Sequence, residues 1–222
     1  MMRSAGREQG MIRTTLAASA LAFCTLTAAS AAPTKAQAPA KAMPVKSVAA
    51  AEPKGLAIDI LKPGEIVDPG SFSWAQGTIP RRSSGEGRNI APDLYWNSGP
   101  PDVDEKVKDH VVLVESLGPG GAATTHWIVL GLQRMLKVPE GGVWETPPPS
   151  VRYGLSSDGK QGYSGPKPGK GVAQECVIEV FALDRPMSAP AGTTRAQVLA
   201  EMKGHVLAGA SLKATYTGGS PI

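Results

Sequence analysis

The sequence has few of the residues that form disulfide frameworks or metal centres. Its 222 residues include two cysteines, Cys24 and Cys176, and three histidines without close spacing. Zinc sites need clustered His and Cys ligands, so a metal centre is not expected. Since Cys24 falls in an N-terminal segment typical of export signals, the processed chain would keep one cysteine and form no internal disulfide. We predict that Cys176, which precedes two β-branched residues, is a small buried hydrophobe rather than a reactive thiol.

Dense positive charge is also missing. The formal net charge is +4, with 23 basic and 19 acidic residues; three arginines and one glutamate lie within residues 1–31, so 20 basic and 18 acidic residues remain beyond them. No run of Lys and Arg is dense enough to follow a phosphate backbone, so nucleic acid is not an expected partner. A Gly-rich phosphate-binding loop and a dinucleotide fingerprint are absent from the sequence as well. We therefore expect no cofactor.

Residues 1–31 form a predicted secretory signal peptide. Arginines precede a short apolar run at 14–29, and an Ala-Ser-Ala triplet follows as a cleavage site. The run is too short and too rich in Ala and Thr for a good membrane span. Lipid attachment at Cys24 is disfavoured because the residue before it is bulky. The protein is predicted to be periplasmic or secreted, with translation starting at Met1 or Met11.

Residues 32–54 consist largely of Ala, Pro and Lys and contain no aromatic residue. Such a composition cannot bury enough apolar surface to become ordered, so we predict a disordered linker. The folded domain is expected to span residues 55–222.

The domain sequence predicts a mainly β fold. The chain contains 26 Gly and 20 Pro, which favours a turn-rich β protein over a helical bundle. Strands are predicted over residues 56–61, 110–115, 126–131, 175–183 and 211–216. The run at 175–183 carries Glu175 and Glu179 among apolar residues. Residues 138–172 form a long Gly- and Pro-rich passage, and long ordered loops tend to carry binding sites.

One helix is predicted late in the chain, from Thr194 to about Lys203. Thr194 and Gln197 have the spacing of a capping box, and Gly204 can end the helix in a left-handed turn. A further short helical turn is possible over residues 205–209. Strands separated by loops, without alternation of strand and helix, predict an antiparallel sandwich with little helix.

Four segments in this order resemble the phosphatidylethanolamine-binding protein family. They are Gly87 to Trp96 (GRNIAPDLYW), the strand 111–115 followed by His126-Trp127, the Gly162-Tyr-Ser-Gly-Pro166 segment followed by a strand ending at Asp184, and residues 193–216. The last is similar to the C-terminal helix and strand of the bacterial YbhB/YbcL-like (Raf kinase inhibitor-like) branch. The resemblance covers about residues 56–217.

The resemblance implies a β-sandwich in which a large antiparallel sheet packs on a smaller one, with one or two short C-terminal helices. It also implies a small pocket for an anion such as a phospholipid head group, and some members inhibit kinases or proteases. An imidazole and loop amides can bind an anion through charge-assisted hydrogen bonds. The implied ligand-binding residues are His126, Glu115, Gly165, Pro166 and Gln174.

The sequence departs from the family pattern at this pocket. Where the family usually carries Asp-Pro-Asp, this chain has Ser116-Leu-Gly118 after Glu115, and Gln174 and Cys176 replace a usual His and aromatic residue. The pocket is therefore predicted to be partly degenerate. Glu115 would replace a lost carboxylate only if its side chain turns inward; otherwise it faces solvent. His126 is as compatible with a structural role as with ligand binding, and Gly165-Pro166 as compatible with a simple turn.

The remaining aromatic residues and histidines have less specific predictions. Trp96 and Trp127 are expected in the core or the pocket wall, and His110 and His205 in structural or solvent-facing positions.

Three functions remain open on the sequence. The first is an exported binding protein for a small anion or phospholipid head group. The second is a protein-interaction module, such as a protease or kinase inhibitor, with a vestigial pocket. The third is a hydrolase whose triad forms only in space, since no nucleophile elbow is present. We do not expect an enzyme, and no catalytic residue is assigned.

Overall fold

The structure is a computed structural model that describes residues 52–66, 71–72, 74 and 77–219. All of these belong to one compact unit, residues 48–222. The predicted signal peptide, Cys24 and all but the last three linker residues lie outside the described residues, so the predicted domain boundaries stay a prediction. Within the described part, no helix is long and apolar enough to cross a membrane.

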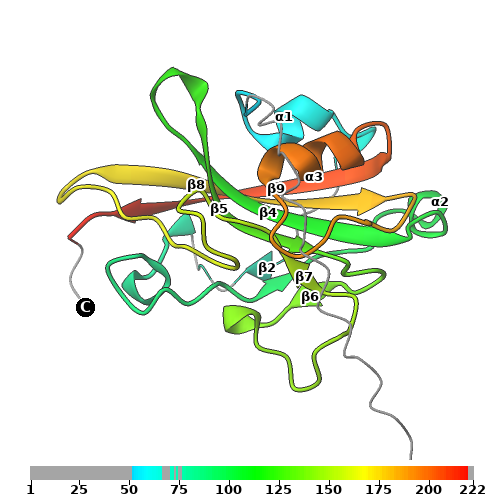
Figure 1. Cartoon of the computed structure of the whole chain (residues 1–222), viewed down its shortest axis with the longest axis horizontal. Helices are drawn as coiled ribbons and strands as arrows, with labels where there is room; N and C mark the ends of the chain where they lie inside the picture. The colour runs from blue at the N-terminus through cyan, green and yellow to red at the C-terminus, as the bar shows by residue number, and fades with distance from the viewer. Residues whose placement is uncertain (1–51, 67–70, 73, 75–76, 220–222) are drawn as a thin grey trace, which may run out of the picture. The chain divides into compact units, whose positions relative to one another are not determined.

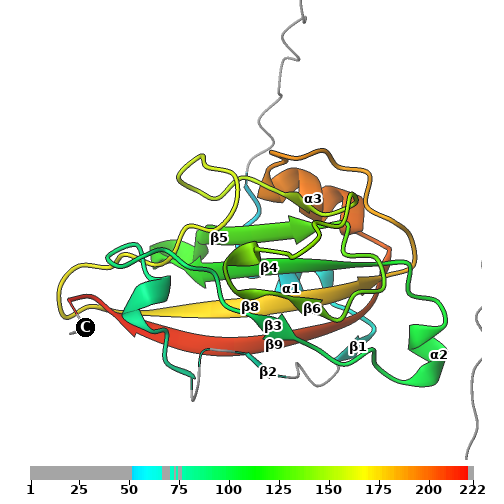
Figure 2. The ribbon, with the colours of Figure 1, turned by 90° about the horizontal axis from the view of Figure 1, so that it is seen from below.

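A six-stranded sheet forms the centre of the unit, with strand order β1-β9-β8-β4-β5-β7. Its strands are β1 (Glu65–Ile66), β4 (Asp109–Leu117), β5 (Ala123–Leu130), β7 (Arg152–Tyr153), β8 (Ala173–Leu183) and β9 (Val206–Thr217). All neighbouring pairs are antiparallel except β1 with β9. The long strands β4, β5, β8 and β9 run side by side through the molecule in Figures 1 and 2. Because β4 and β8 are covered on both faces, their sequences are nearly continuous apolar runs.

A three-stranded sheet, β2 (Ser71–Phe72), β3 (Leu94–Tyr95) and β6 (Lys137–Val138), covers one face of the large sheet. Figure 1 shows it below the long strands. Between the two sheets lies a core of buried residues from both: Trp74, Leu94, Trp96, Val112, Val114, Trp127, Val129, Val138, Ile178 and Tyr216. Trp96 and Trp127 are thus core residues. This two-layer arrangement confirms the predicted β-sandwich.

Two helices cover the opposite face of the large sheet, α1 (Ala57–Leu61) and α3 (Arg195–Met202), drawn above the sheet in Figure 1. They bury a second core, formed by Ala57, Val198, Leu199 and Met202 against Val111, Leu113, Ile128, Leu130, Phe181 and Leu183. A third short helix, α2 (Pro101–Asp104), precedes β4, and single 3-10 turns occur at η2 (Arg81–Ser83), η3 (Pro119–Gly121) and η4 (Glu140–Gly142).

The predicted late helix is confirmed as α3. Thr194 and Gln197 form the capping box, and Gly204 has a left-handed φ of 82° just after the helix. The turn considered for residues 205–209 is wrong, because from Val206 onward this stretch pairs with β8 as the first part of β9.

The strand predicted over residues 56–61 is also wrong, because this stretch forms α1. The backbone N–H of Ala57 donates to Glu115 Oε2 at 3.1 Å, and that of Ile58 to Glu179 Oε1 at 2.9 Å. Carboxylates that accept the first free amides of a helix stabilise its start. Lys62 ends the helix with a left-handed φ of 48°. Both carboxylates are far away in sequence, so local periodicity could not reveal them.

Candidate functional site

A register shift positions His126 on the large sheet. In the β4–β5 pairing, Val114 lies opposite Trp127 but Glu115 lies opposite Thr125, so His126 is an extra residue on β5. A bulge of this kind re-aims side chains and is common beside binding sites. Here it brings the His126 imidazole to the hydroxyl of Ser116.

A directed chain of hydrogen bonds joins Gln174, Ser116, His126 and Ser164. His126 Nδ1 lies 2.7 Å from the carbonyl oxygen of Ser164, and its Nε2 lies 2.9 Å from Ser116 Oγ. Because a carbonyl only accepts, Nδ1 carries the hydrogen. Burial lowers the pKa of His126 and so favours the neutral ring, whose Nε2 accepts from the Ser116 hydroxyl. Ser116 Oγ in turn accepts from Gln174 Nε2 at 2.8 Å.

This chain has both structural and chemical consequences. A serine hydroxyl bonded to a histidine nitrogen is the geometry of an activated nucleophile. Ser116, however, is only 1% exposed, and its hydroxyl is engaged both as donor and as acceptor. The contact is therefore better suited to fixing the imidazole than to attacking a substrate.

A cavity of about 450 Å³ adjoins this chain where β4 ends and β8 begins. Its polar lining includes Ser116, Thr124, Gln174, Glu175 and Lys213, and its apolar lining includes Leu56, Leu117, Pro119, Pro168, Val172 and Val177. His126 is 4% exposed and lies behind Ser116, outside the lining. We call this space the β4–β8 cavity.

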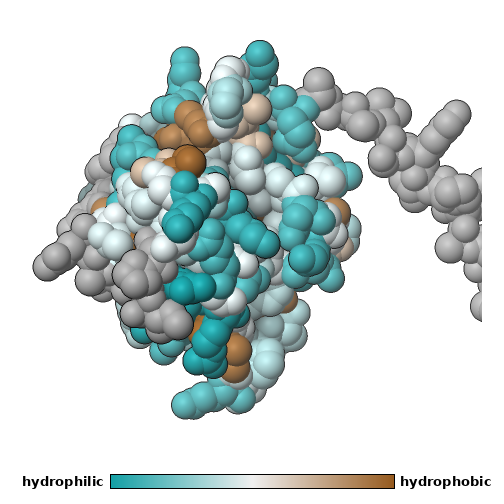
Figure 3. All heavy atoms as spheres, turned by 90° about the vertical axis from the view of Figure 1, so that its left-hand side faces the viewer, coloured by the Kyte–Doolittle hydropathy of each residue, from teal (hydrophilic) through white to brown (hydrophobic). Residues whose placement is uncertain are grey.

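The mouth of the β4–β8 cavity combines exposed apolar and charged groups. Leu117 and Val172 are 47% and 53% exposed. Lys213 Nζ and Glu175 Oε1 form an ion pair at 2.8 Å. Figure 3 views this end of the sheet and shows a small hydrophobic area near its top among hydrophilic surface. Such a mouth suits a molecule with an apolar part and a charged part.

Gly165 and Pro166 do not line the β4–β8 cavity; they pack on the segment around η2. Gly165 N–H donates to Asn89 Oδ1 at 2.7 Å, and the Pro166 carbonyl accepts from Gly85 N–H at 3.0 Å. A Cβ at Gly165 would lie 2.2 Å from the carbonyl oxygen of Ser83. Only glycine permits this close approach. Their role in the structure is to hold the loop whose Ser164 carbonyl orients His126.

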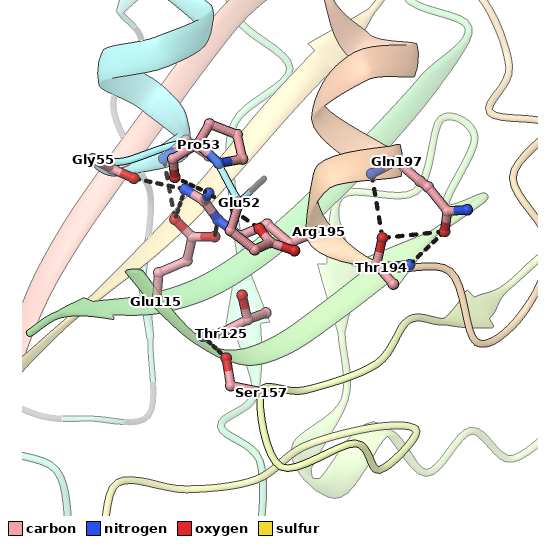
Figure 4. A network of polar contacts seen from close by, with 10 residues as sticks. Glu52, Pro53, Gly55, Glu115, Thr125, Ser157, Thr194, Arg195 and Gln197 are labelled. Carbon is pink, nitrogen blue, oxygen red and sulfur yellow. Dashed lines mark hydrogen bonds and ion pairs between the residues drawn. The ribbon is translucent and has the colours of Figure 1, made fainter. Parts of the chain in front are cut away.

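Glu115 is not brought together with His126 and Gln174. It is fully buried on the helix-covered face, where its Oε1 accepts from Arg195 Nε at 2.6 Å and its Oε2 from Arg195 Nη2 at 3.1 Å. Figure 4 shows Arg195 bridging Glu115 and the segment before α1. Glu115 therefore neither turns toward the pocket nor faces solvent, the two orientations considered from the sequence. On β4 it continues the alternation of Val111 and Leu113, which pack on that same face.

The partners of Glu115 were missed by sequence reasoning. Arg195 also donates to the carbonyls of Pro53 and Gly55 at 2.8 and 2.6 Å. Burial and the neighbouring charge of Glu115 raise the pKa of Glu179, which lies on β8 and on the same face of the large sheet as Glu115. Glu179, an acid within the apolar run 175–183, was the available signal, since buried acids need partners.

The remaining predicted positions are structural. Cys176 is fully buried, and burial raises the pKa of its thiol to about 12, which confirms the buried hydrophobe. His110 is 1% exposed with its Nδ1 2.7 Å from the Gln133 carbonyl, and His205 pairs with Asp184 at 2.9 Å.

Comparison with known proteins places these residues in a family context. Residues 72–217 match the family model described as phosphatidylethanolamine-binding protein. A UPF0098 protein of Methanothermobacter thermautotrophicus is 31% identical over 151 residues, covering 65% of this chain and 93% of the relative. YbhB of Escherichia coli is 31% identical over 137 residues, covering 60% and 84%. LppC of Mycobacterium tuberculosis, named as a lipoprotein, is 27% identical over 172 residues, covering 75% and 81%.

Solved structures agree with the fold. A phosphatidylethanolamine-binding protein homolog from Chlamydia trachomatis has a TM-score of 0.54 and 28% identity, covering 68% of this chain and 94% of its own. YbcL of Escherichia coli has a TM-score of 0.53 and 23% identity, covering 70% and 92%, a level that shows the fold alone.

Proposed function

This chain belongs to the phosphatidylethanolamine-binding protein family, in its bacterial YbhB/YbcL branch, and we propose that it is an exported protein that binds a small amphipathic ligand of the phospholipid head-group type in the β4–β8 cavity. Members of this family are generally binding proteins rather than enzymes. The observation that carries the proposal is the cavity itself, whose lining combines exposed apolar residues with Gln174 and the Lys213–Glu175 ion pair.

The charges at the mouth fit a zwitterion. Lys213 and Glu175 present one positive and one negative group 2.8 Å apart, with side chains 65% and 53% exposed. A phosphate oxygen can pair with the ammonium and a ligand amine with the carboxylate. Leu117 and Val172 offer apolar contact to the first carbons of a chain, and burying each methylene contributes about 0.8 kcal/mol.

A titration with a water-soluble, short-chain phosphatidylethanolamine tests this proposal. The expected result is saturable NMR shifts of the Gln174 side-chain amide and the Val172 methyls. Val172→Ser should weaken binding about tenfold, because it removes apolar contact at the mouth. Val143→Ser is the matched control, since Val143 is 76% exposed and lies outside the cavity lining. Equal effects of the two substitutions would count against the cavity as the binding site.

Export is part of the proposal and rests on the sequence of residues 1–31. A charged start, a short apolar run and a small-residue cleavage site support a secretory signal. Cell fractionation of the full chain and of a chain lacking residues 1–31 tests it, and equal amounts of both in the cytoplasm would contradict it. The protein-interaction hypothesis becomes the leading one if the lipid titration gives no response.

A further inference from the structure

The hydrogen-bond chain at the inner end of the β4–β8 cavity determines which polar groups a ligand can reach. His126 donates its only ring hydrogen to the Ser164 carbonyl, and its Nε2 accepts from Ser116. The imidazole therefore offers no donor to a ligand. The lone pair on Nε2 already accepts a hydrogen bond from the Ser116 hydroxyl.

Ser116 also accepts one of the two amide hydrogens of Gln174. One Nε2 hydrogen of Gln174 points to Ser116 Oγ, at 2.8 Å. Ser116 Oγ thus lies between an imidazole and an amide, in the position that an anion's oxygen would have to take in order to contact both. At 1% exposure this hydroxyl is packed, and Ser116 belongs to the cavity lining whereas His126 does not.

We propose that Ser116 is a specificity-determining residue that closes the imidazole position to bare anions, so that the wild-type cavity selects ligands held by its apolar and zwitterionic mouth. This inference rests on the proposed function for the ligand class. It goes beyond that proposal in assigning discrimination against inorganic phosphate to one side chain. A free phosphate has no apolar part for Leu117 and Val172 and no amine for Glu175, so among the lining residues it gains only the exposed ammonium of Lys213.

Removing the hydroxyl changes what the site can bind. In Ser116→Ala, Gln174 Nε2 and His126 Nε2 lose their shared partner, and a phosphate oxygen can take its place. A proton on His126 Nε2 then stabilises the bound phosphate, because an imidazolium donates a charge-assisted hydrogen bond to the anion. Phosphate binding to this variant should therefore strengthen as pH falls through the pKa of His126.

The experiment titrates inorganic phosphate into wild-type protein, Ser116→Ala and Ser116→Thr, following the His126 ring signals by NMR. Wild-type His126 should not move at millimolar phosphate, and Ser116→Ala should bind phosphate at least about tenfold more tightly. Ser116→Thr keeps the hydroxyl and should behave as wild type. Thr124→Ala is the control for a hydroxyl that lines the same cavity without contacting His126. Backbone amide spectra verify that each variant is folded.

The outcomes separate this inference from the proposed function. A shift of wild-type His126 with phosphate, or no gain in a folded Ser116→Ala, overturns the role of Ser116 even if the short-chain lipid binds. If the lipid does not bind wild-type protein but Ser116→Ala gains phosphate, the proposed function fails and the role of Ser116 stands.

Discussion

Two buried carboxyl groups, Glu115 and Glu179, bind the first amides of α1, and one guanidinium, that of Arg195, pairs with Glu115. Glu115 pairs with Arg195 at 2.6 Å, whereas Glu179 is also fully buried and its Oε2 has no hydrogen-bond partner among the described residues. Two ionised carboxylates beside one cation would leave an uncompensated buried charge, which is costly. A proton on Glu179 removes that charge, in agreement with its raised pKa.

This arrangement predicts a specific pH dependence of stability. Burial raises the pKa of Glu179 above its ordinary value of 4.5, so above that pH the folded state holds a proton that the unfolded state has lost. The stability that depends on this proton is complete below pH 4.5 and is lost as pH rises through the folded-state pKa. Glu179→Gln keeps an acceptor for Ile58 N–H and removes the titration.

The free energy of unfolding of Glu179→Gln should therefore rise relative to wild type by up to about 1.4 kcal/mol for each pH unit between pH 4.5 and the folded-state pKa of Glu179. Urea denaturation between about pH 5 and about pH 8 measures this difference. Glu175→Gln, on the same strand but exposed, should follow the wild-type curve. Parallel curves for Glu179→Gln and wild type would show that Glu179 is ionised in the folded state.

The element that orients His126 is the loop around Ser164, which is fixed by its packing on the segment around η2. Gly165 approaches the Ser83 and Ser84 backbone so closely that an added Cβ would lie 2.2 and 2.9 Å from their atoms. The Tyr163 hydroxyl also donates to the Ser83 carbonyl at 2.6 Å. The position of this loop therefore sets the orientation of the imidazole, because the Ser164 carbonyl accepts the hydrogen bond from His126 Nδ1.

Gly165→Ala should destabilise the protein by about 2 kcal/mol, because backbone on both sides must move apart. It should also shift the His126 ring signals. Gly169→Ala is the control in the same loop: its Cβ would meet only Val172 Cγ2, at 3.7 Å, and the change should stay within about 0.5 kcal/mol. Equal unfolding free energies for the two variants would contradict the close packing of Gly165.

At the element scale, the sequence predicted the elements that local interactions fix and missed the one that distant residues fix. The strands β4, β5 and β8 were predicted because continuous apolar runs record burial on both faces locally. Helix α3 was predicted because its capping box lies within four residues. Helix α1 was not predictable, because its first amides are bound by Glu115 and Glu179, 58 and 121 residues away in the chain.

At the scale of the whole molecule, the sandwich was predictable but the candidate site only partly so. Sequence reasoning chose His126 and Gln174, and the fold joins them through Ser116, which had been noted only as a departure from Asp-Pro-Asp. It also chose Glu115, which the fold buries on the helix-covered face with Arg195. The bulge at His126 depends on how β4 and β5 pair, so neither strand's own sequence reveals it. Glu115, in contrast, follows the ordinary alternation of β4.

The most direct test of the account is an isotope-filtered NOE spectrum of wild-type protein with the short-chain phosphatidylethanolamine. We predict contacts from the acyl chain to the methyl groups of Leu117 and Val172, and from the ethanolamine group to Glu175 and Lys213. Contacts confined to residues outside the β4–β8 cavity, or no intermolecular contacts at saturating lipid, would contradict the central claim that this cavity binds the ligand.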